Sequence, residues 1–366
     1  MARAEDVIRA MEACAPPALA VEGDPVGLRA GSHAQPVRRV LLALDASPAT
    51  VAEARRRGAQ MLLTHHPPFY RGLSSLQAEE PDGALAGAIL NANLVVYSAH
   101  TNLDAAPGGV ADVLADAAGM GPERAPLQVT RREPFLKLTA FVPAGALEKV
   151  RRAVCAAGAG RYGAYSQCTF GVRGTGTFLP GAGARPYLGR AGRLEEADEY
   201  RLETRLRERD RAAVEAALRK SHPYEMPAYD FTRLDESIDF GLGRVGDRAE
   251  AVRLGALADA LARRLRAPGV QVHGAPGRRV RRLAVWTGQG APLAQAARAG
   301  AQVLVTGECG YHEAQDAPWF GLSIVRLGHG ASERPVLAPL ARRLRGLVPG
   351  VRFSVSRDRA ALFRNL

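Results

Sequence analysis

Histidine and carboxylate side chains recur in this sequence where apolar, strand-like runs end. The set consists of His65, His66, His100, Asp104, Glu308, His329 and Glu333. A lone histidine at a strand end is usually a hydrogen-bonded structural residue, but here five of the 8 histidines, these four and His312, lie at or near such positions. Functional groups of α/β sheets gather where strands end and loops begin, so we expect these side chains to lie together.

The types and spacing of these residues indicate a site for divalent metal ions. Imidazole and carboxylate groups without a neighbouring thiolate suit Zn, Mn or Fe. A spacing of four residues places His329 and Glu333 on one face of a helical turn, and the same holds for His100 and Asp104 if their loop is helical. Two ions roughly 3.5–4 Å apart would share a carboxylate and activate water between them.

The elements that must position these residues alternate between strand and helix in the first third of the chain. Short apolar runs predict strands over 39–44, 60–64 and 94–97. Helical patterns follow these runs, over 48–57, 84–91 and 110–118. This alternation predicts an α/β layer with largely parallel strand pairing.

The pattern changes near Phe135. A strand is predicted to end at Pro143, a helix follows over 146–157, and a glycine-rich patch covers 158–183. An alternating strand over 200–207 precedes a helix that Asp210 is expected to cap. The order strand, helix, strands, helix, strand predicts a small ferredoxin-like α+β module. We interpret GLGRVGD, from Gly241, as the linker that leaves this module.

The last third of the chain repeats the first. RRVLLALDASPATVAEARRRGAQMLLTHH begins at Arg38, and RRLAVWTGQGAPLAQAARAGAQVLVTGE begins at Arg281. Both run from paired arginines through a strand and a helix to a second apolar strand. We therefore predict an internally duplicated α/β fold split by an inserted α+β module, with segments 1–130, 131–235 and 236–366.

Two glycine-rich strings, GVRGTGTF and WTGQGAP, lack the forms of a P-loop or of a dinucleotide-binding fingerprint. WTGQGAP lies between a predicted strand and a predicted helix. We interpret it as a plain turn, with an anion cradle at the helix N-terminus as the alternative.

The composition bears on the partners of the protein. Among 366 residues, 49 are Lys or Arg, and only Lys137, Lys149 and Lys220 are lysines. The formal charge of +12 favours anionic partners such as phosphates or nucleic acid, or it reflects the coding bias of the source genome. Nucleic-acid binding predicts an affinity that falls steeply with salt, while aromatic residues, at 6%, are few for stacking on single strands.

We expect no membrane partner and a cytoplasmic location. The N-terminal segment carries charges where a signal peptide needs an apolar run, and no stretch approaches the roughly 18 apolar residues of a membrane span. The 4 cysteines lie far apart without CxxC pairing, which argues against a disulfide framework or a thiolate zinc site.

Four strings at the predicted metal positions resemble the motifs of the NIF-three-like dinuclear-metal-centre family, also described as GTP cyclohydrolase I type 2 homologs. They are LLTHHPPF, SAHTNLDAAPGGVADVLA, TGECGYHEAQDA and LGHGASE. VEGDPVGLRAG resembles the family's opening block, but Pro25 stands in place of the usual Asn and Gly23 in place of Trp. The middle segment resembles a domain of longer bacterial members that is similar to PII and CutA, through AGAGRYGAYSQCTF, GTGTFLPG and HPYEMPAY.

The resemblance implies a ligand set and an assembly. The implied ligands of two divalent ions per chain are His65, His66, Asp104, His329 and Glu333, with Glu333 as the bridging carboxylate. The residues with implied supporting or proton-transfer roles are His100, Glu308 and His312. The family also implies a homohexamer whose metal sites face an internal cavity.

The predicted function is a metal-dependent hydrolase that acts on a small molecule, most simply a nucleotide. The resemblance implies chemistry of the GTP cyclohydrolase type, in which the five-membered ring of guanine is opened by hydrolysis and formate is released. Two alternatives stay open. One is a non-catalytic metal-binding regulatory or scaffold protein, in which the inserted module senses a ligand or partner, and the other is a nucleic-acid-binding hexamer.

Overall fold

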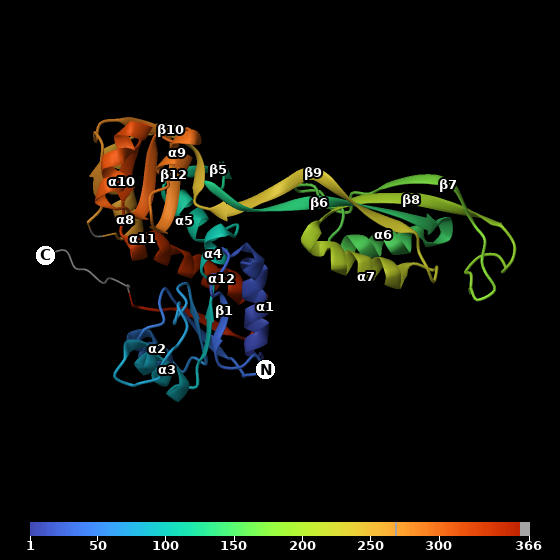
Figure 1. The fold of residues 1–366 in the computed structure, drawn as a ribbon, viewed down its shortest axis with the longest axis horizontal. Helices are drawn as coiled ribbons and strands as arrows, with labels where there is room; N and C mark the ends of the chain where they lie inside the picture. The colour runs from blue at the N-terminus through green and yellow to red at the C-terminus, as the bar shows by residue number, and fades with distance from the viewer. Residues whose placement is uncertain (268, 359–366) are drawn as a thin grey trace. The chain divides into compact units, whose positions relative to one another are not determined.

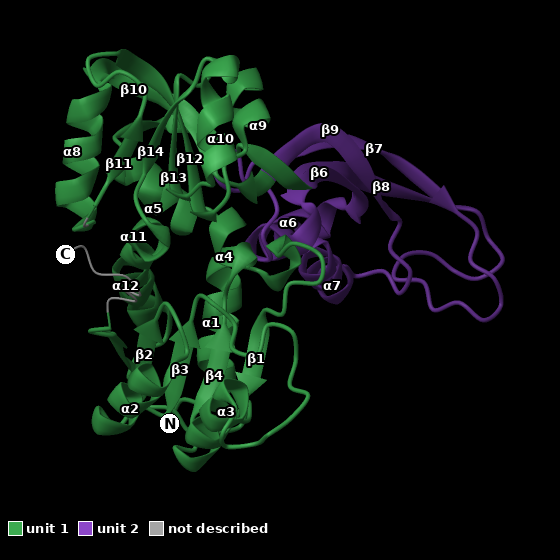
Figure 2. Cartoon of the chain, turned by 60° about the vertical axis from the view of Figure 1, so that its left-hand side comes forward, with its two compact units in different colours: residues 1–131, 240–366 green, residues 132–239 purple. Residues whose placement is uncertain are grey.

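The computed structural model describes residues 1–267 and 269–358 (Figure 1). Pro268 and residues 359–366, the end of the expected third segment, lie outside the described residues. The chain divides into two units, which are unit 1 (1–131 and 240–366) and unit 2 (132–239) (Figure 2). Within the described ranges, no helix is long and apolar enough to cross a membrane.

One sheet of unit 1 is built from both ends of the chain. Its strands are β1 (Gly27–Ala30), β2 (Arg39–Ala43), β3 (Met61–Thr64), β4 (Val95–Ser98) and β15 (Arg352–Val355), in the order β1-β4-β3-β2-β15. All run parallel except β1, which pairs with β4 antiparallel. Parallel strands are covered on both faces, which is why β2 and β3 are apolar without alternation.

The other sheet of unit 1 has a matching parallel centre. Its strands are β5 (Met120–Ala125), β10 (Arg244–Arg253), β11 (Gln271–His273), β12 (Arg279–Gln289), β13 (Val303–Glu308) and β14 (Ser323–Arg326), in the order β11-β14-β13-β12-β10-β5. β12, β13 and β14 run parallel. β5 comes from the first third of the chain, whereas β15 of the last third joins the other sheet. The first third of the chain therefore contributes an edge strand to the sheet of the last third, and the last third contributes an edge strand to the sheet of the first.

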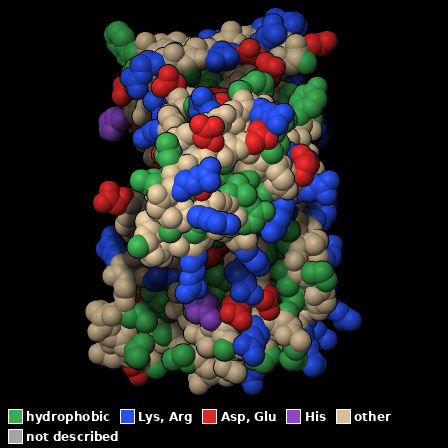
Figure 3. All heavy atoms as spheres, turned by 90° about the vertical axis from the view of Figure 1, so that its right-hand side faces the viewer, with side chains coloured by type: hydrophobic (Ala, Val, Ile, Leu, Met, Phe, Trp, Pro, Cys, Tyr) green, Lys and Arg blue, Asp and Glu red, His purple; other side chains and the backbone are tan. Residues whose placement is uncertain are grey.

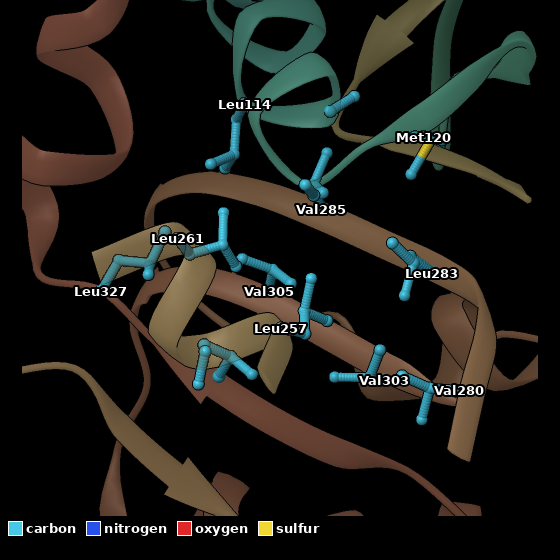
Figure 4. Close-up of a cluster of buried hydrophobic side chains, with 14 of the residues drawn as sticks. Leu114, Met120, Leu257, Leu261, Val280, Leu283, Val285, Val303, Val305 and Leu327 are labelled. Carbon is cyan, nitrogen blue, oxygen red and sulfur yellow. The ribbon is translucent and has the colours of Figure 1, made fainter. Parts of the chain in front are cut away.

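Helices cover both faces of the second sheet. Val303 and Val305 of β13 point into a cluster with α8 (Leu254–Leu265) and α5 (Val110–Ala117), part of which Figure 4 shows. Leu304, between them, points into a second cluster with α9 (Leu293–Arg298). Side chains alternate across a strand, so the apolar run buries both of its faces.

Helices also pack against the first sheet. α2 (Pro48–Arg56) and α3 (Pro81–Asn91) contribute Val51, Ala54 and Ile89 to the cluster that contains Leu41 and Leu62 of the sheet. α12 (Leu337–Leu347) packs against β15 and α1 (Ala4–Cys14).

Unit 2 is built on a four-stranded sheet with two helices. The strands are β6 (Gln128–Pro143), β7 (Phe170–Phe178), β8 (Glu195–Arg207) and β9 (Tyr229–Leu242), in the order β7-β8-β6-β9. α6 (Leu147–Ala156) follows β6, and α7 (Arg211–Ser221) follows β8. Their buried residues Val150, Val154 and Val214 pack with Leu138 and Leu202 of the sheet. The order along the chain is strand, helix, strand, strand, helix, strand.

Two local predictions differ from the structure, and the glycine-rich patch, for which no bounds of a strand were predicted, contains one. GLGRVGD is not a linker, because β9 continues to Leu242 and β10 begins at Arg244, with Gly243 alone between them at a φ of +62°. The glycine-rich patch contains the whole of β7. Asp210 stands at the N-cap of α7 without a capping hydrogen bond from its side chain, because a 3-10 turn (Glu208–Asp210) leads directly into the helix.

Many arginines of unit 2 lie in ion pairs on its sheet. Arg173 pairs with Asp198 at 2.7 Å, and Arg201 pairs with Glu203. On the face drawn in Figure 3, basic side chains are interspersed with acidic and hydrophobic ones. The positive charge of this face is thus spread out rather than gathered into one patch.

A buried ion pair joins residues of the first and last thirds of the chain in unit 1. Arg244, 5% exposed, donates to both oxygens of the Asp112 carboxylate and to the carbonyls of Gly241 and Gly243. Burial raises the pKa of Asp112, but the hydrogen bonds and charge of Arg244 outweigh burial and lower this pKa overall. The pair therefore remains charged at neutral pH.

Replacing Arg244 by Met is expected to lower the free energy of unfolding by about 3 kcal/mol, because it removes the main partner of the buried Asp112 carboxylate and leaves Arg124, 2.9 Å away, as its remaining ion-pair partner. Urea unfolding followed by circular dichroism measures the change. The control is Arg9→Met, which removes an exposed pair with Asp6 and should leave the free energy of unfolding almost unchanged. Equal losses in the two variants would contradict a structural role for the buried pair.

Candidate metal centre

Polar side chains from both sheets of unit 1 meet at the carboxyl ends of the parallel strands. The residues that follow or end these strands are Asp45 after β2, His65 and His66 after β3, His100 after β4, Glu308 of β13 and His329 after β14. Two short helices begin at the same edge: α4 (Thr101–Ala105) carries Asp104, and α11 (His329–Glu333) carries Glu333. This edge is where α/β sheets place functional groups.

His65 presents an unpaired nitrogen to two carboxylates. Its Nδ1–H donates to the Ala99 carbonyl at 2.9 Å, so the other nitrogen, Nε2, carries the lone pair in the neutral ring. This buried Nε2 has no hydrogen-bond partner and lies 3.8 Å from Asp104 Oδ1 and 3.9 Å from Glu333 Oε1. Burial lowers the pKa of His65, which favours the neutral ring. A cation between these three groups would remove the repulsion between their lone pairs.

His66 and His329 face the other oxygen of Glu333. The Nε2 atoms of the two rings lie 3.3 Å apart, and they lie 3.0 and 3.3 Å from Glu333 Oε2. Their Nδ1 atoms contact carboxylates, of Asp45 at 2.7 Å and of Glu308 at 3.3 Å. Burial opposes protonation of His66, but hydrogen bonds to Asp45 and Glu333 raise its pKa to about 10.

Asp104 and His100 complete the cluster on the side of His65. Asp104 is buried, and Thr287 donates to its Oδ1 at 3.0 Å. Burial raises the pKa of Asp104. His100 lies beside the rings of His65 and His66, and its Nδ1 contacts Asp24 Oδ1 at 2.9 Å. The predicted i, i+4 relation of His100 and Asp104 is realised, because α4 makes this loop helical.

Glu333 lies at the middle of the cluster in a space that a glycine leaves open. Its carboxylate is buried, but the imidazole rings of His329 and His66 beside its Oε2 outweigh the effect of burial and lower its pKa. Gly288, at the end of β12, has a φ of +65°, and a Cβ there would lie 2.4 Å from Glu333 Oε1. The WTGQGAP string thus accommodates the side chain of Glu333.

The donor set fits metal ions. Ligand atoms of His65, His66 and His100 lie within 4.8 Å of one another, and so do those of His66, His329 and Glu333. In all four rings an oxygen of the protein contacts Nδ1, which leaves Nε2 for a ligand bond, and such outer partners are typical of metal-binding histidines. The unpaired Nε2 of His65 facing carboxylates is the strongest single sign that this cluster binds a cation.

The structure brings together all but one of the residues that the sequence singled out. Glu308 contacts His329, as described above, with 38% of its side chain exposed. His312 differs, because it lies exposed on the short helix α10 (Tyr311–Asp316) with its ring against Tyr311. Within the described part of the chain, no contact joins His312 to the cluster.

Sequence reasoning missed several residues that hold the cluster in place. Asp45 ends the RVLLALD run, so the strand-end rule that found His65 applies to it equally. Asp24 lies in the opening block, and its carboxylate accepts hydrogen bonds from the backbone and hydroxyl of Thr101 as well as contacting His100. Thr287 and Gly288 lie in WTGQGAP, which the sequence indicates only as a turn, because their roles depend on segments remote in sequence.

These observations define the class of the protein. It is a mixed α/β protein with histidine–carboxylate clusters able to bind metal ions. A family model described as Duf34/NIF3 (NGG1p interacting factor 3) matches residues 2–359. The chain belongs to this family.

Curated relatives and a solved structure agree with this assignment. A "GTP cyclohydrolase 1 type 2 homolog" of Halalkalibacterium halodurans is 41% identical, over 91% of this chain and 90% of that protein. The protein of the same name from Bacillus subtilis is 38% identical, over 96% and 94%. The crystal structure of a Bacillus cereus protein related to NIF3 has a TM-score of 0.92 and 36% identity, and the match covers 100% of this chain and 99% of that one.

Replacing Gly288 by Ala should strongly reduce metal uptake, because the new Cβ would displace the carboxylate of Glu333. The measurement is bound Mn or Zn per chain after loading and dialysis. The control is Gly300→Ala, which also has a positive φ, +74°, but whose Cβ would meet nothing closer than 3.6 Å. Equal metal content in the two variants would show that the close approach of Gly288 to Glu333 is unimportant.

Proposed function

We propose that this protein is a hydrolase that works with two divalent metal ions held at this centre. The observation that carries the proposal is the division of the Glu333 carboxylate between two groups of ligands. Its Oε1 faces His65, and its Oε2 faces His66 and His329. A buried carboxylate that serves two ligand groups is what a pair of neighbouring ions requires.

The chain would hold one ion through His65, Asp104 and Glu333, and the other through His66, His329 and Glu333. The first group includes the unpaired Nε2 of His65, so an ion there needs no change of tautomer. In the second group, the proton shared by His66 and Glu333 must leave before the imidazole nitrogen binds an ion, because a ligand imidazole is neutral. The identity of the ions, among Zn, Mn and Fe, follows from availability as much as from these ligands.

When bound, the ions would supply Lewis-acid chemistry that activates water for hydrolysis. The chain's own residues orient the ligands and carry protons. Asp24 holds His100 through Nδ1, which leaves Nε2 of this half-buried ring for proton transfer. Glu308 holds His329 in the same way and is exposed enough to exchange protons with solvent or substrate.

The proposed substrate is a nucleotide, and the proposed reaction is opening of a purine ring with release of formate. The names of the curated relatives support this choice, as do the basic charge of the chain and the hydrolytic chemistry that two ions supply. The alternatives, a non-catalytic metal-binding protein and a nucleic-acid-binding hexamer, become the conclusion only if the reaction below is not found.

We also propose an origin and an assembly for the fold. The parallel centres of the two sheets of unit 1, β2-β3-β4 and β12-β13-β14, and their matching sequences support an internal duplication. The chain order and sheet order of unit 2 support an inserted ferredoxin-like module of the PII and CutA kind. Family resemblance supports a homohexamer with the metal centres facing an internal cavity.

Single substitutions should remove the two ions separately or together. We expect about two divalent ions per chain in the native protein, about one in Asp104→Asn and in His329→Ala, and few or none in Glu333→Gln. Glu79→Gln, which changes an exposed carboxylate outside the metal centre, is the matched control and should retain both ions. Metal analysis after dialysis gives the stoichiometry. A Glu333→Gln variant that loses no more metal than Asp104→Asn would exclude a bridging role.

The reaction is tested by loading the full chain with Mn, Zn or Fe, adding GTP, and measuring formate. We expect formate release, reduced at least about a hundredfold in His66→Ala and Glu333→Ala and unchanged in His33→Ala, an exposed histidine outside the centre. Absence of formate with every metal would contradict the cyclohydrolase reaction. If metal binding persisted, that result would favour the regulatory or scaffold alternative.

A further inference from the structure

Unit 2 has a pocket of its own, with a volume of about 380 Å³. Its walls come from β7 and the segment that follows it, from β8, and from the turn after α7. Two strings that the sequence analysis singled out, GTGTFLPG (174–181) and HPYEMPAY (222–229), line this pocket, and the metal centre uses neither of them.

Aromatic rings form the wall of the pocket. The rings of Phe178 and Tyr187 each lie 6.1 Å from the ring of Tyr224, measured between centroids. His222 fixes this arrangement, because its Nε2 donates to the Phe141 carbonyl and its Nδ1 accepts from the Tyr224 backbone. The aromatic wall is therefore formed before any ligand arrives.

A buried carboxylate belongs to the same pocket. Glu199 of β8 is 7% exposed, and the Tyr224 hydroxyl donates to its Oε1 at 2.8 Å. Among the described residues, no Lys, Arg or His nitrogen lies within 4 Å of this carboxylate. Glu199 therefore has no ion-pair partner in that part of the chain. Gly176 leaves room for it, because a Cβ at that position would lie 2.2 Å from Glu199 Oε2. The two charged residues that line the pocket, Glu199 and Glu225, are both acidic.

We propose that this pocket binds a small organic cation, namely a protonated amine with an apolar body. The ammonium group would pair with Glu199, and the body would lie against Phe178 and Tyr187. A buried carboxylate without a cation is unfavourable, and the faces of aromatic rings attract positive charge, so both features favour the same ligand. The site goes beyond the proposed hydrolase activity, because it shares no residue with the metal centre.

The test compares two probes of similar size on the full-length protein. Phenethylammonium is the cation, and 2-phenylethanol is its neutral counterpart. Dissociation constants are measured at neutral pH by calorimetry, with saturation-transfer NMR to detect weak binding. We expect the cation to bind roughly ten- to thirtyfold more tightly than the alcohol.

Variants separate the pocket from other acidic surfaces. Glu199→Gln keeps the shape of the side chain and should abolish the preference for the cation, whereas Phe178→Leu should weaken both probes. Glu203→Gln, on the same strand but in an ion pair with Arg201, is the control and should bind like the native protein. Far-UV circular dichroism verifies folding. Binding of neither probe, equal binding of both, or a cation preference that survives in Glu199→Gln would overturn the proposal.

Discussion

The burial of the Glu333 carboxylate among imidazoles is the constraint on which the rest of unit 1 depends. A carboxylate at this depth needs positive charge or hydrogen-bond donors, and the chain places His66 and His329, one from each sheet, at its Oε2. That requirement explains the glycine at position 288 and the short helix that places Glu333 one turn after His329. It also explains why the carboxyl ends of the two sheets meet. The unpaired nitrogen of His65 shows that protein groups alone do not satisfy the cluster.

The exchange of edge strands keeps this arrangement in register. β15 extends the sheet of the first third of the chain, and β5 extends the sheet of the last third. Separation of the first third of the chain from the last third would therefore break strand pairing in both sheets as well as the Arg244–Asp112 pair. A centre whose ligands come from both sheets needs this rigidity, because metal ligands must be held within a fraction of an ångström of their positions.

Unit 2 is stabilised by an apolar cluster and by hydrogen bonds around its pocket, without the metal centre. Its sheet is stabilised by the apolar cluster under α6 and α7, and its pocket is stabilised by hydrogen bonds around Tyr224 and Glu199. In both units a glycine makes room for a buried carboxylate, Gly288 for Glu333 and Gly176 for Glu199. In each case a residue with a Cβ at the glycine position would displace the carboxylate from its buried position. The buried negative charge favours the binding of a cation.

The sequence by itself determined the strands of the parallel sheets and the residues at their ends. Continuous apolar runs predict buried strands from local composition, and the i, i+4 spacing of His329 and Glu333 is a local property of one helical turn. Local composition also explains the wrong prediction for Gly241–Asp247. This glycine-rich string predicts a linker, but it continues two strands because neighbouring strands supply hydrogen-bond partners for its backbone.

Only the tertiary structure decided which groups touch. The contacts of Asp45 with His66 and of Thr287 with Asp104 join residues far apart in the chain. The pocket around Glu199 likewise depends on strings that are separated in the sequence. Burial and hydrogen-bond geometry set the tautomer of His65 and the pKa of His66, and both depend on atoms that only folding brings together.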